Sequence, residues 1–138
     1  MAAGDIVKTH AFSVEKVDID TDEDIAAGEV INDVGGAGFE QADAANKGPF
    51  MIALEARVYA TDTAAGKAHT MNALFSGIID VLKVTGALAK GKNVQIDSAT
   101  PGSVMAWNEV ITDVYAIVGI VNKDAASGDA TVQVRLRC

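Results

Sequence analysis

The chain has 138 residues, of which 49% are hydrophobic and 22% charged, a composition that excludes an intrinsically disordered protein and fits one domain with a substantial core. Its formal net charge of -8 repels a phosphate backbone, so we expect no nucleic-acid partner. The longest apolar stretch, around Val114 to Val121, is far shorter than a membrane-spanning helix, so we expect no membrane partner.

The first half of the chain has short apolar segments between turn signals. Residues 1–13 lack periodicity and a signal-peptide pattern, so we expect the mature chain to begin with an N-terminal arm, followed by a single β-rich domain over residues 14–138. Val14–Ile19 alternates imperfectly, which predicts a bulged or short edge strand. Phe50–Tyr59 has apolar residues at every second position from Ile52, which predicts a central strand.

The middle of the chain is less clearly patterned. Thr61–Thr70 is small and polar, and Met71–Ser76 fits either one helical turn or the start of a strand. The Val and Ile content of Ile78–Val84, bounded by Gly77 and Gly86, predicts a strand.

The C-terminal third is expected to close the fold. Pro and Gly in Thr100–Ser103 predict a turn, and Val104–Asn108 fits a short helix or a loop. Val110–Val121 and Thr131–Leu136 are predicted strands joined as a hairpin around Ala126–Asp129. The fold class is therefore expected to be mainly β, with at most one or two short helices.

Two segments of the chain echo each other. Ala26-Ala-Gly-Glu-Val-Ile-Asn32 is similar to Ala89-Lys-Gly-Lys-Asn-Val-Gln-Ile-Asp97, since each has small residues, a turn glycine and then a β-branched segment. Turn chemistry alone can produce such a match, so the sequence leaves open whether the chain is an internal duplication.

Four acidic residues have the spacing of calcium-loop ligands. Asp18, Asp20, Asp22 and Glu29 stand where such a loop has ligands, but Glu23 replaces the glycine that its sharp turn needs. The simpler interpretation is a solvated acidic loop. A calcium-dependent adhesion or binding module that uses residues 18–29 is the alternative function.

Catalytic motifs are incomplete. His10 and His69 have no ligand spacing for zinc and are expected at the surface, and neither Ser76 nor Ser103 stands in a Gly-x-Ser-x-Gly turn. We therefore expect no enzyme, no cofactor and no firm metal site.

Several segments resemble a known family. Gly77–Gly86, Ala89–Asp97, Val118–Asn122 and Ala125–Leu136 are similar, in order and spacing, to the strands and turns of the decoration, or cement, proteins of tailed-virus capsids. Ala26–Val30 is similar to an earlier turn of that family.

The resemblance implies a small β-barrel-like or β-tulip-like fold on the outer capsid surface of a virion, made in the host cytoplasm. It also implies that the major capsid protein is the partner, and that the chain forms a homo-oligomer, with a trimer favoured. The role would be to clamp neighbouring capsid subunits.

Three large apolar residues are candidate interface anchors. Phe12, Met105 and Trp107 are of types that concentrate at the cores of protein interfaces. Trp107 fits ordinary core packing equally well, because a lone Trp beside a Pro-Gly turn can serve either purpose.

Overall fold

The computed structural model describes residues 2–33, 38–46, 48–84, 86–108 and 114–136. They form ten β-strands, one short α-helix and one 3-10 helix, so the predicted mainly β domain with at most two short helices is confirmed. Within the described ranges, no helix is long and apolar enough to cross a membrane.

Residues 13–76, called unit 1, form a five-stranded antiparallel sheet in the order β1-β5-β4-β2-β3. The central strand β4 is buried throughout, because neighbouring strands flank it and the core covers it. The elements of unit 1 are β1 (Ser13–Asp18), β2 (Val30–Asp33), β3 (Phe39–Gln41), β4 (Met51–Ala53), α1 (Tyr59–Ala64) and β5 (Thr70–Ser76).

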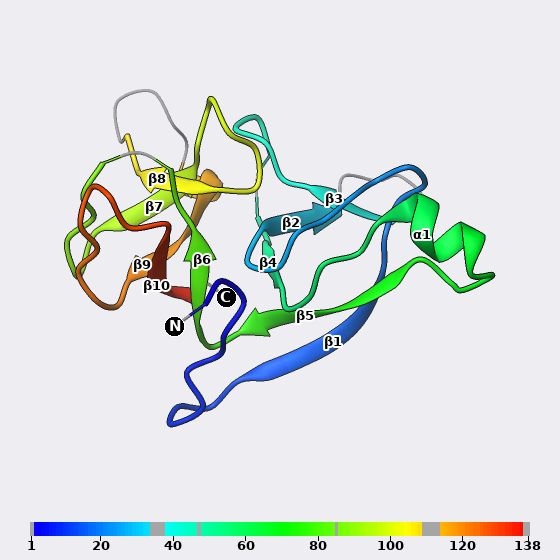
Figure 1. The fold of residues 1–138 in the computed structure, drawn as a ribbon. Coiled ribbons are helices and arrows are strands. Elements are labelled where there is room, and N and C mark those ends of the chain that lie inside the picture. The colour runs from blue at the N-terminus through cyan, green and yellow to red at the C-terminus, as the bar shows by residue number, and fades with distance from the viewer. Residues whose placement is uncertain (1, 34–37, 47, 85, 109–113, 137–138) are drawn as a thin grey trace.

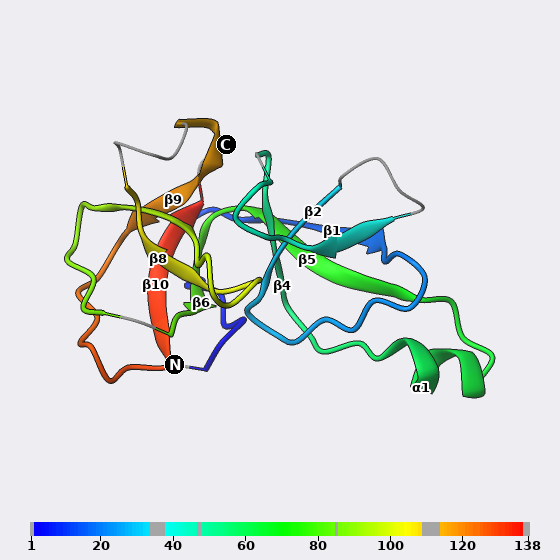
Figure 2. The ribbon, with the colours of Figure 1, turned by 90° about the horizontal axis from the view of Figure 1, so that it is seen from above.

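Residues 78–136, called unit 2, form a second five-stranded antiparallel sheet in the order β6-β10-β9-β7-β8. Figure 1 shows the two units side by side, with α1 at the end of unit 1 away from unit 2, and Figure 2 shows the same arrangement from above. The elements of unit 2 are β6 (Ile78–Leu82), β7 (Asn93–Ile96), β8 (Val104–Ala106), η1 (Val114–Ala116), β9 (Ile117–Val121) and β10 (Thr131–Leu136).

The two units have the same topology. In each, the first strand pairs with the fifth, the fifth with the fourth, the fourth with the second and the second with the third. In each, a parallel bridge also joins the residue after the first strand to the start of the third, Ile19 to Phe39 and Lys83 to Val104. These bridges link the two edges of each sheet, so the strands form two curled sheets rather than one continuous barrel.

The turns before β2 and β7 are equivalent in detail. Gly28 N–H donates to Ala53 O at 2.8 Å, and Gly91 N–H donates to Val121 O at 2.8 Å. Both glycines have a positive φ, 83° and 88°, which an L side chain rarely adopts. The two similar sequence segments thus occupy the same place in the two units, which favours duplication over turn chemistry alone.

The buried apolar residues form two clusters. The larger one contains residues of both units, such as Leu74 from unit 1 with Val81 and Val134 from unit 2. The smaller one, which includes Ile31 and Met71, lies within unit 1. The units therefore share one core as well as a topology.

Three strand predictions are confirmed in place, and the bounds of the first two differ from those predicted. Val14–Ile19 corresponds to the edge strand β1, which has a register shift between Ser13 and Val14. Phe50–Tyr59 is strand only over Met51–Ala53, because the chain bends at Leu54 and Glu55 before α1. Thr131–Leu136 alternates as expected, with its Val and Leu residues buried.

One segment differs from its prediction, and for another the structure decides between two predicted alternatives. Val104–Asn108 is not a helix or loop, because Val104–Ala106 pairs with β7 as an edge strand. Met71–Ser76 is strand, and the preceding polar segment forms α1 and a turn. Part of the predicted strand Val110–Val121, residues 110–113, lies outside the described residues.

The predicted N-terminal arm lies partly along unit 2. Gly4 N–H donates to Asp80 O at 2.7 Å, and Val7 N–H donates to Ile78 O at 2.9 Å. Residues 4–7 thus run beside β6, the edge strand of unit 2, and cover its outer side.

Candidate functional site

A groove of about 920 Å³ lies at the β7–β8 edge of unit 2. Its walls come from the turn before β7 and from the edge strand β8 with the residues after it. Two of the three predicted interface anchors, Met105 and Trp107, line this groove together. The lining residues are Ala87, Leu88, Ala89, Gly91, Lys92, Asn93, Met105, Ala106, Trp107 and Asn108.

Trp107 and Met105 are both half-buried in this groove, called the Trp107 groove below. Trp107 N–H donates to Asn93 O at 3.0 Å, and Met105 pairs with Gln95 of β7. The backbone therefore fixes the position of both apolar side chains at the open edge of the sheet. A half-buried Trp beside a Met on an edge strand is typical of the core of a protein interface.

Phe12 lies elsewhere, at the β1–β5 edge of unit 1. It is 42% exposed, and two further apolar side chains, Val14 (40%) and Phe75 (42%), are similarly exposed. Ser13 pairs with Ser76 and Val14 with Leu74, so Phe75 lies opposite the step between Ser13 and Val14. We call Phe12, Val14 and Phe75 the Phe12 patch; the sequence analysis found only its first member, because Phe75 follows no clear strand pattern.

Glu29, the last residue of the proposed calcium loop, points into the protein. It is 7% exposed, and its Oε1 accepts a hydrogen bond from Ala26 N–H at 2.6 Å. Its Oε2 accepts a hydrogen bond from Gln41 Nε2. The carboxylate thus holds the turn before β2 to the last residue of β3.

The other three carboxylates of that loop do not gather around Glu29. Asp18 ends β1, Asp20 accepts a hydrogen bond from Thr21 N–H, and Asp22 is exposed with a φ of 67°. Among the described residues, no group of three or more His, Cys, Asp or Glu side chains is placed to hold a metal ion. The structure therefore does not assemble Asp18, Asp20, Asp22 and Glu29 into one site.

His69 is buried, contrary to the surface position expected from sequence, with 9% of its side chain exposed. Its Nδ1 lies 2.7 Å from Asp62 Oδ2, and its Nε2 lies 2.7 Å from Glu23 O. Both acceptors are satisfied when both ring nitrogens carry a hydrogen. Neither nitrogen contacts Ser76 or Ser103, so the imidazole links α1 to the acidic loop rather than to a serine.

Asp62 is the buried acid of α1, with 4% of the residue exposed. The hydrogen bond from His69 lowers the pKa of Asp62, and Arg57, whose Nη1 lies 3.5 Å from Asp62 Oδ1, lowers it further. The ring of Tyr59 meets the His69 ring edge-on at 5.2 Å. This small polar cluster holds α1 against the rest of unit 1.

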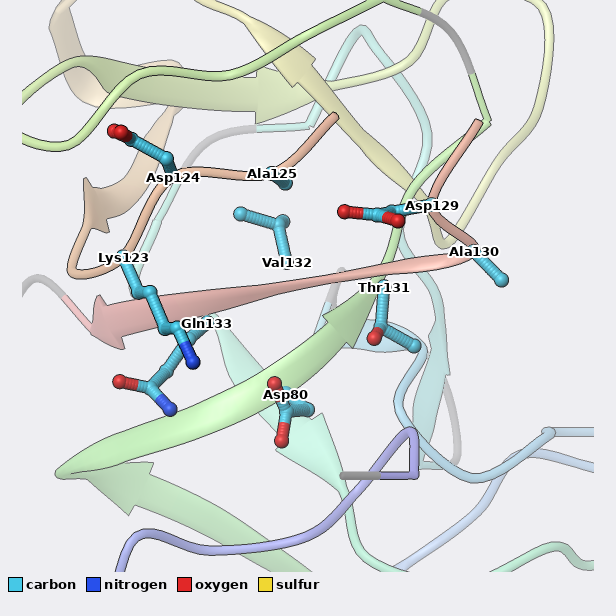
Figure 3. A pocket seen from close by; sticks show the side chains of 9 residues that line it. All are labelled: Asp80, Lys123, Asp124, Ala125, Asp129, Ala130, Thr131, Val132 and Gln133. Carbon is cyan, nitrogen blue, oxygen red and sulfur yellow. The ribbon is translucent and has the colours of Figure 1, made fainter. Parts of the chain in front are cut away.

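Asp80, for which the sequence favours a solvated position, is a buried carboxylate in β6. It is 6% exposed, and within the described chain its Oδ2 has no hydrogen-bond partner. Burial raises the pKa of Asp80. Figure 3 shows it beside a pocket of about 330 Å³, with Thr131 and Gln133 on the neighbouring strand β10. The signal available in the sequence was an acid between β-branched residues of a buried strand.

Lys83 is the one buried lysine among the described residues, at 4% exposure. Its Nζ donates to three backbone carbonyls, Ala126 O at 3.1 Å, Ser127 O at 3.3 Å and Asp129 O at 3.0 Å. The ammonium group therefore closes the β9–β10 turn onto the end of β6.

The comparison of this chain with protein-family models finds no match, and neither does the comparison with curated proteins.

Proposed function

We propose that this chain is a structural virion protein, a decoration or cement protein that binds the outer surface of a capsid and stabilises contacts between major capsid subunits. It acts as a homo-oligomer, with a trimer favoured, and is made in the host cytoplasm before it joins the particle. Neither a cofactor nor an enzymatic activity is part of this proposal.

The observation that carries the proposal is where the family-like segments lie. Gly77–Gly86 contains β6, Ala89–Asp97 contains β7, Val118–Asn122 lies on β9, and Ala125–Leu136 contains β10. They supply four of the five strands of one curled sheet, all except β8. Ala26–Val30, the fifth similar segment, occupies the equivalent turn of unit 1. The resemblance therefore follows the topology of both units.

The exposed apolar residues supply a surface for the capsid. Phe12, Val14 and Phe75 are each at least 40% exposed, while the chain as a whole is strongly acidic. An acidic surface keeps crowded copies apart, and a local apolar patch provides the contact area that desolvates on binding. We assign the Phe12 patch as the capsid-facing contact.

Particles purified from cells that encode the chain test this proposal. Quantitative mass spectrometry should find the chain in a fixed ratio to the major capsid protein, and cryo-electron microscopy should place it on the outside of the shell. Its absence from the particles would overturn the proposal.

Add-back to particles that lack the chain tests the Phe12 patch. The double variant Phe12→Ser with Phe75→Ser should co-sediment with such particles at least about tenfold more weakly than the wild type, because it removes the aromatic anchors. Val58→Ser is the matched control, since Val58 is also 42% exposed but lies beside α1. Equal binding of the patch variant and the wild type would reject this surface.

A further inference from the structure

Unit 2 packs on unit 1 through a defined backbone contact. Gly102, in the loop before β8, donates its N–H to Ala42 O at 2.8 Å and accepts a hydrogen bond from Val30 N–H at 2.8 Å. Leu82, at the end of β6, donates its N–H to Gly28 O at 3.1 Å. Unit 2 thus covers the β2 turn of unit 1, and Gly28, Glu29 and Val30 are all buried.

The equivalent face of unit 2 is open. Trp107 N–H donates to Asn93 O in the way that Ala42 N–H donates to Val30 O, so Trp107 corresponds to Ala42 and Asn93 to Val30. Yet Gly91 and Lys92, the counterparts of Gly28 and Glu29, are exposed. This open face is the Trp107 groove. The equivalent surface of unit 1 is buried under unit 2. No described segment covers the Trp107 groove of unit 2.

The described part of unit 1 that matches the covering part of unit 2 is also open; the position that matches Gly102, residue 37, lies outside the described residues. In the strand register, Asp18 of β1 corresponds to Leu82 of β6, since Asp18 pairs with Thr70 and Leu82 pairs with Thr131. Phe39 corresponds to Val104 through the two parallel bridges. A cavity of about 380 Å³ lies at this place, called the β1–β3 cavity, and its lining residues are Glu15, Lys16, Val17, Asp18, Asp33, Gly38 and Phe39.

Charge favours contact between these two open surfaces. Residues 1–76 hold 13 acidic and 5 basic side chains, whereas residues 77–138 hold 6 of each. Lys92 lines the Trp107 groove and Lys90 is exposed in the same turn. The lining of the β1–β3 cavity is acidic on balance, with Glu15, Asp18 and Asp33 against Lys16. Opposite charges on the two surfaces would steer them together, and two surfaces with charges of the same sign would repel each other.

We infer that the Trp107 groove binds a second copy of this chain through that copy's β1–β3 cavity. The contact repeats, between chains, the packing of unit 2 on unit 1 within the chain. It is head-to-tail, so each copy uses both surfaces, and such an interface closes into a ring when its rotation allows. The inference rests on the homo-oligomer in the proposed function and names its contact surfaces, but it does not require a capsid.

Charge reversal of the groove tests the inference without particles. We expect the purified chain to associate in light scattering after size exclusion and in sedimentation velocity. Lys90→Glu with Lys92→Glu should weaken that association at least about tenfold, because like charges then face each other. The control Lys8→Glu with Lys123→Glu changes the net charge equally at two other exposed lysines and should associate as the wild type does.

A charge swap makes the test specific to the two faces. Adding Glu15→Lys and Asp18→Lys to the groove variant restores opposite charges and should recover association to within about threefold of the wild type. In a mixture of isotopically light and heavy chains, a carbodiimide should couple Lys92 of one copy to Glu15 or Asp18 of another.

Three outcomes would overturn the inference: a wild-type chain that stays monomeric up to about 1 mM, a groove variant that associates normally, or a charge swap that fails to recover. Failure of the proposed function gives a different result. If the chain self-associates through these surfaces but is missing from particles, the proposed capsid role is rejected and the inferred self-association stands.

Discussion

The side chains of Asp62 and His69 are joined by a contact of 2.7 Å between Oδ2 and Nδ1, and both are almost fully buried. The second ring nitrogen of His69 contacts the backbone carbonyl of Glu23 at 2.7 Å. The pair therefore ties α1 to the acidic loop, where a serine partner would have been needed for hydrolytic chemistry.

Asp62→Asn should make the stability of the protein less dependent on acid pH. The pKa of Asp62 is lowered in the folded state by the His69 hydrogen bond, so its contribution is present above the ordinary carboxyl pKa and is lost as pH falls through the lowered value. Melting temperatures measured by circular dichroism should show the wild type above the variant at pH 7, with the gap closing as the pH falls below the ordinary carboxyl pKa of about 3.9. Asp22→Asn, at an exposed site, should leave the profile unchanged, and a constant gap at all pH values would contradict the prediction.

Asp80→Asn should stabilise the protein at neutral pH. Burial raises the pKa of Asp80, so ionisation favours the unfolded chain once the pH rises above the ordinary carboxyl pKa. Urea unfolding should show a more stable variant at pH 7 and no difference below the ordinary carboxyl pKa of about 4. A loss of stability at pH 7 would mean that the carboxylate is better satisfied than its unpartnered Oδ2 indicates.

Lys83→Met should destabilise the β9–β10 turn. The substitution keeps the apolar stem but removes the ammonium group that satisfies three backbone carbonyls, at a cost of about 2 kcal/mol. Hydrogen exchange should show faster exchange at residues 126–129 in particular. Lys123→Met, at an exposed lysine, serves as the control, and unchanged exchange in the Lys83 variant would count against this role.

Gly102→Ala and Gly91→Ala form a matched pair. Both glycines have a positive φ, 81° and 88°, so each substitution costs about 1–2 kcal/mol in backbone strain. A Cβ at Gly102 would also collide with the carboxylate of Glu29, whereas a Cβ at Gly91 meets nothing within 4 Å. Urea unfolding of dilute protein should show Gly102→Ala to be the worse variant by about 1–3 kcal/mol. Equal losses of unfolding free energy in the two variants would mean that Glu29 moves away from the added Cβ without destabilising the contact between the units.

The sequence predicted the strands whose burial follows a simple pattern. In β10, Val132, Val134 and Leu136 alternate with more polar residues, and β9 pairs with it antiparallel as the predicted hairpin requires. Its pairing with β6 on the other side was not predicted. It could not predict β8, because Val104–Ala106 is only three residues long and is strand through its pairing with β7. Pairing between distant segments is a tertiary property that local propensity does not contain.

The candidate sites divide in the same way. Met105 and Trp107 could be chosen from residue type, but their common groove depends on the β7–β8 pairing. Glu29 has the right spacing for a calcium ligand, yet its carboxylate turns inward to Ala26 N–H within the loop and to Gln41, twelve residues further along the chain. Spacing along the chain fixes neither the direction of a side chain nor its partner.

One residue, Gly77, separates β5 from β6, and Leu74 of unit 1 packs in the cluster that unit 2 supplies for the most part. Two copies of a fold arranged along one chain are usually separable, each with its own interior and a tether between them. Here the one-residue connection is too short to let the two units separate, and both units contribute side chains to the same hydrophobic core. The chain is therefore indivisible: cleavage at Gly77 should not release two folded halves, and damage to the packing of one half should lower the melting temperature of the whole in a single transition.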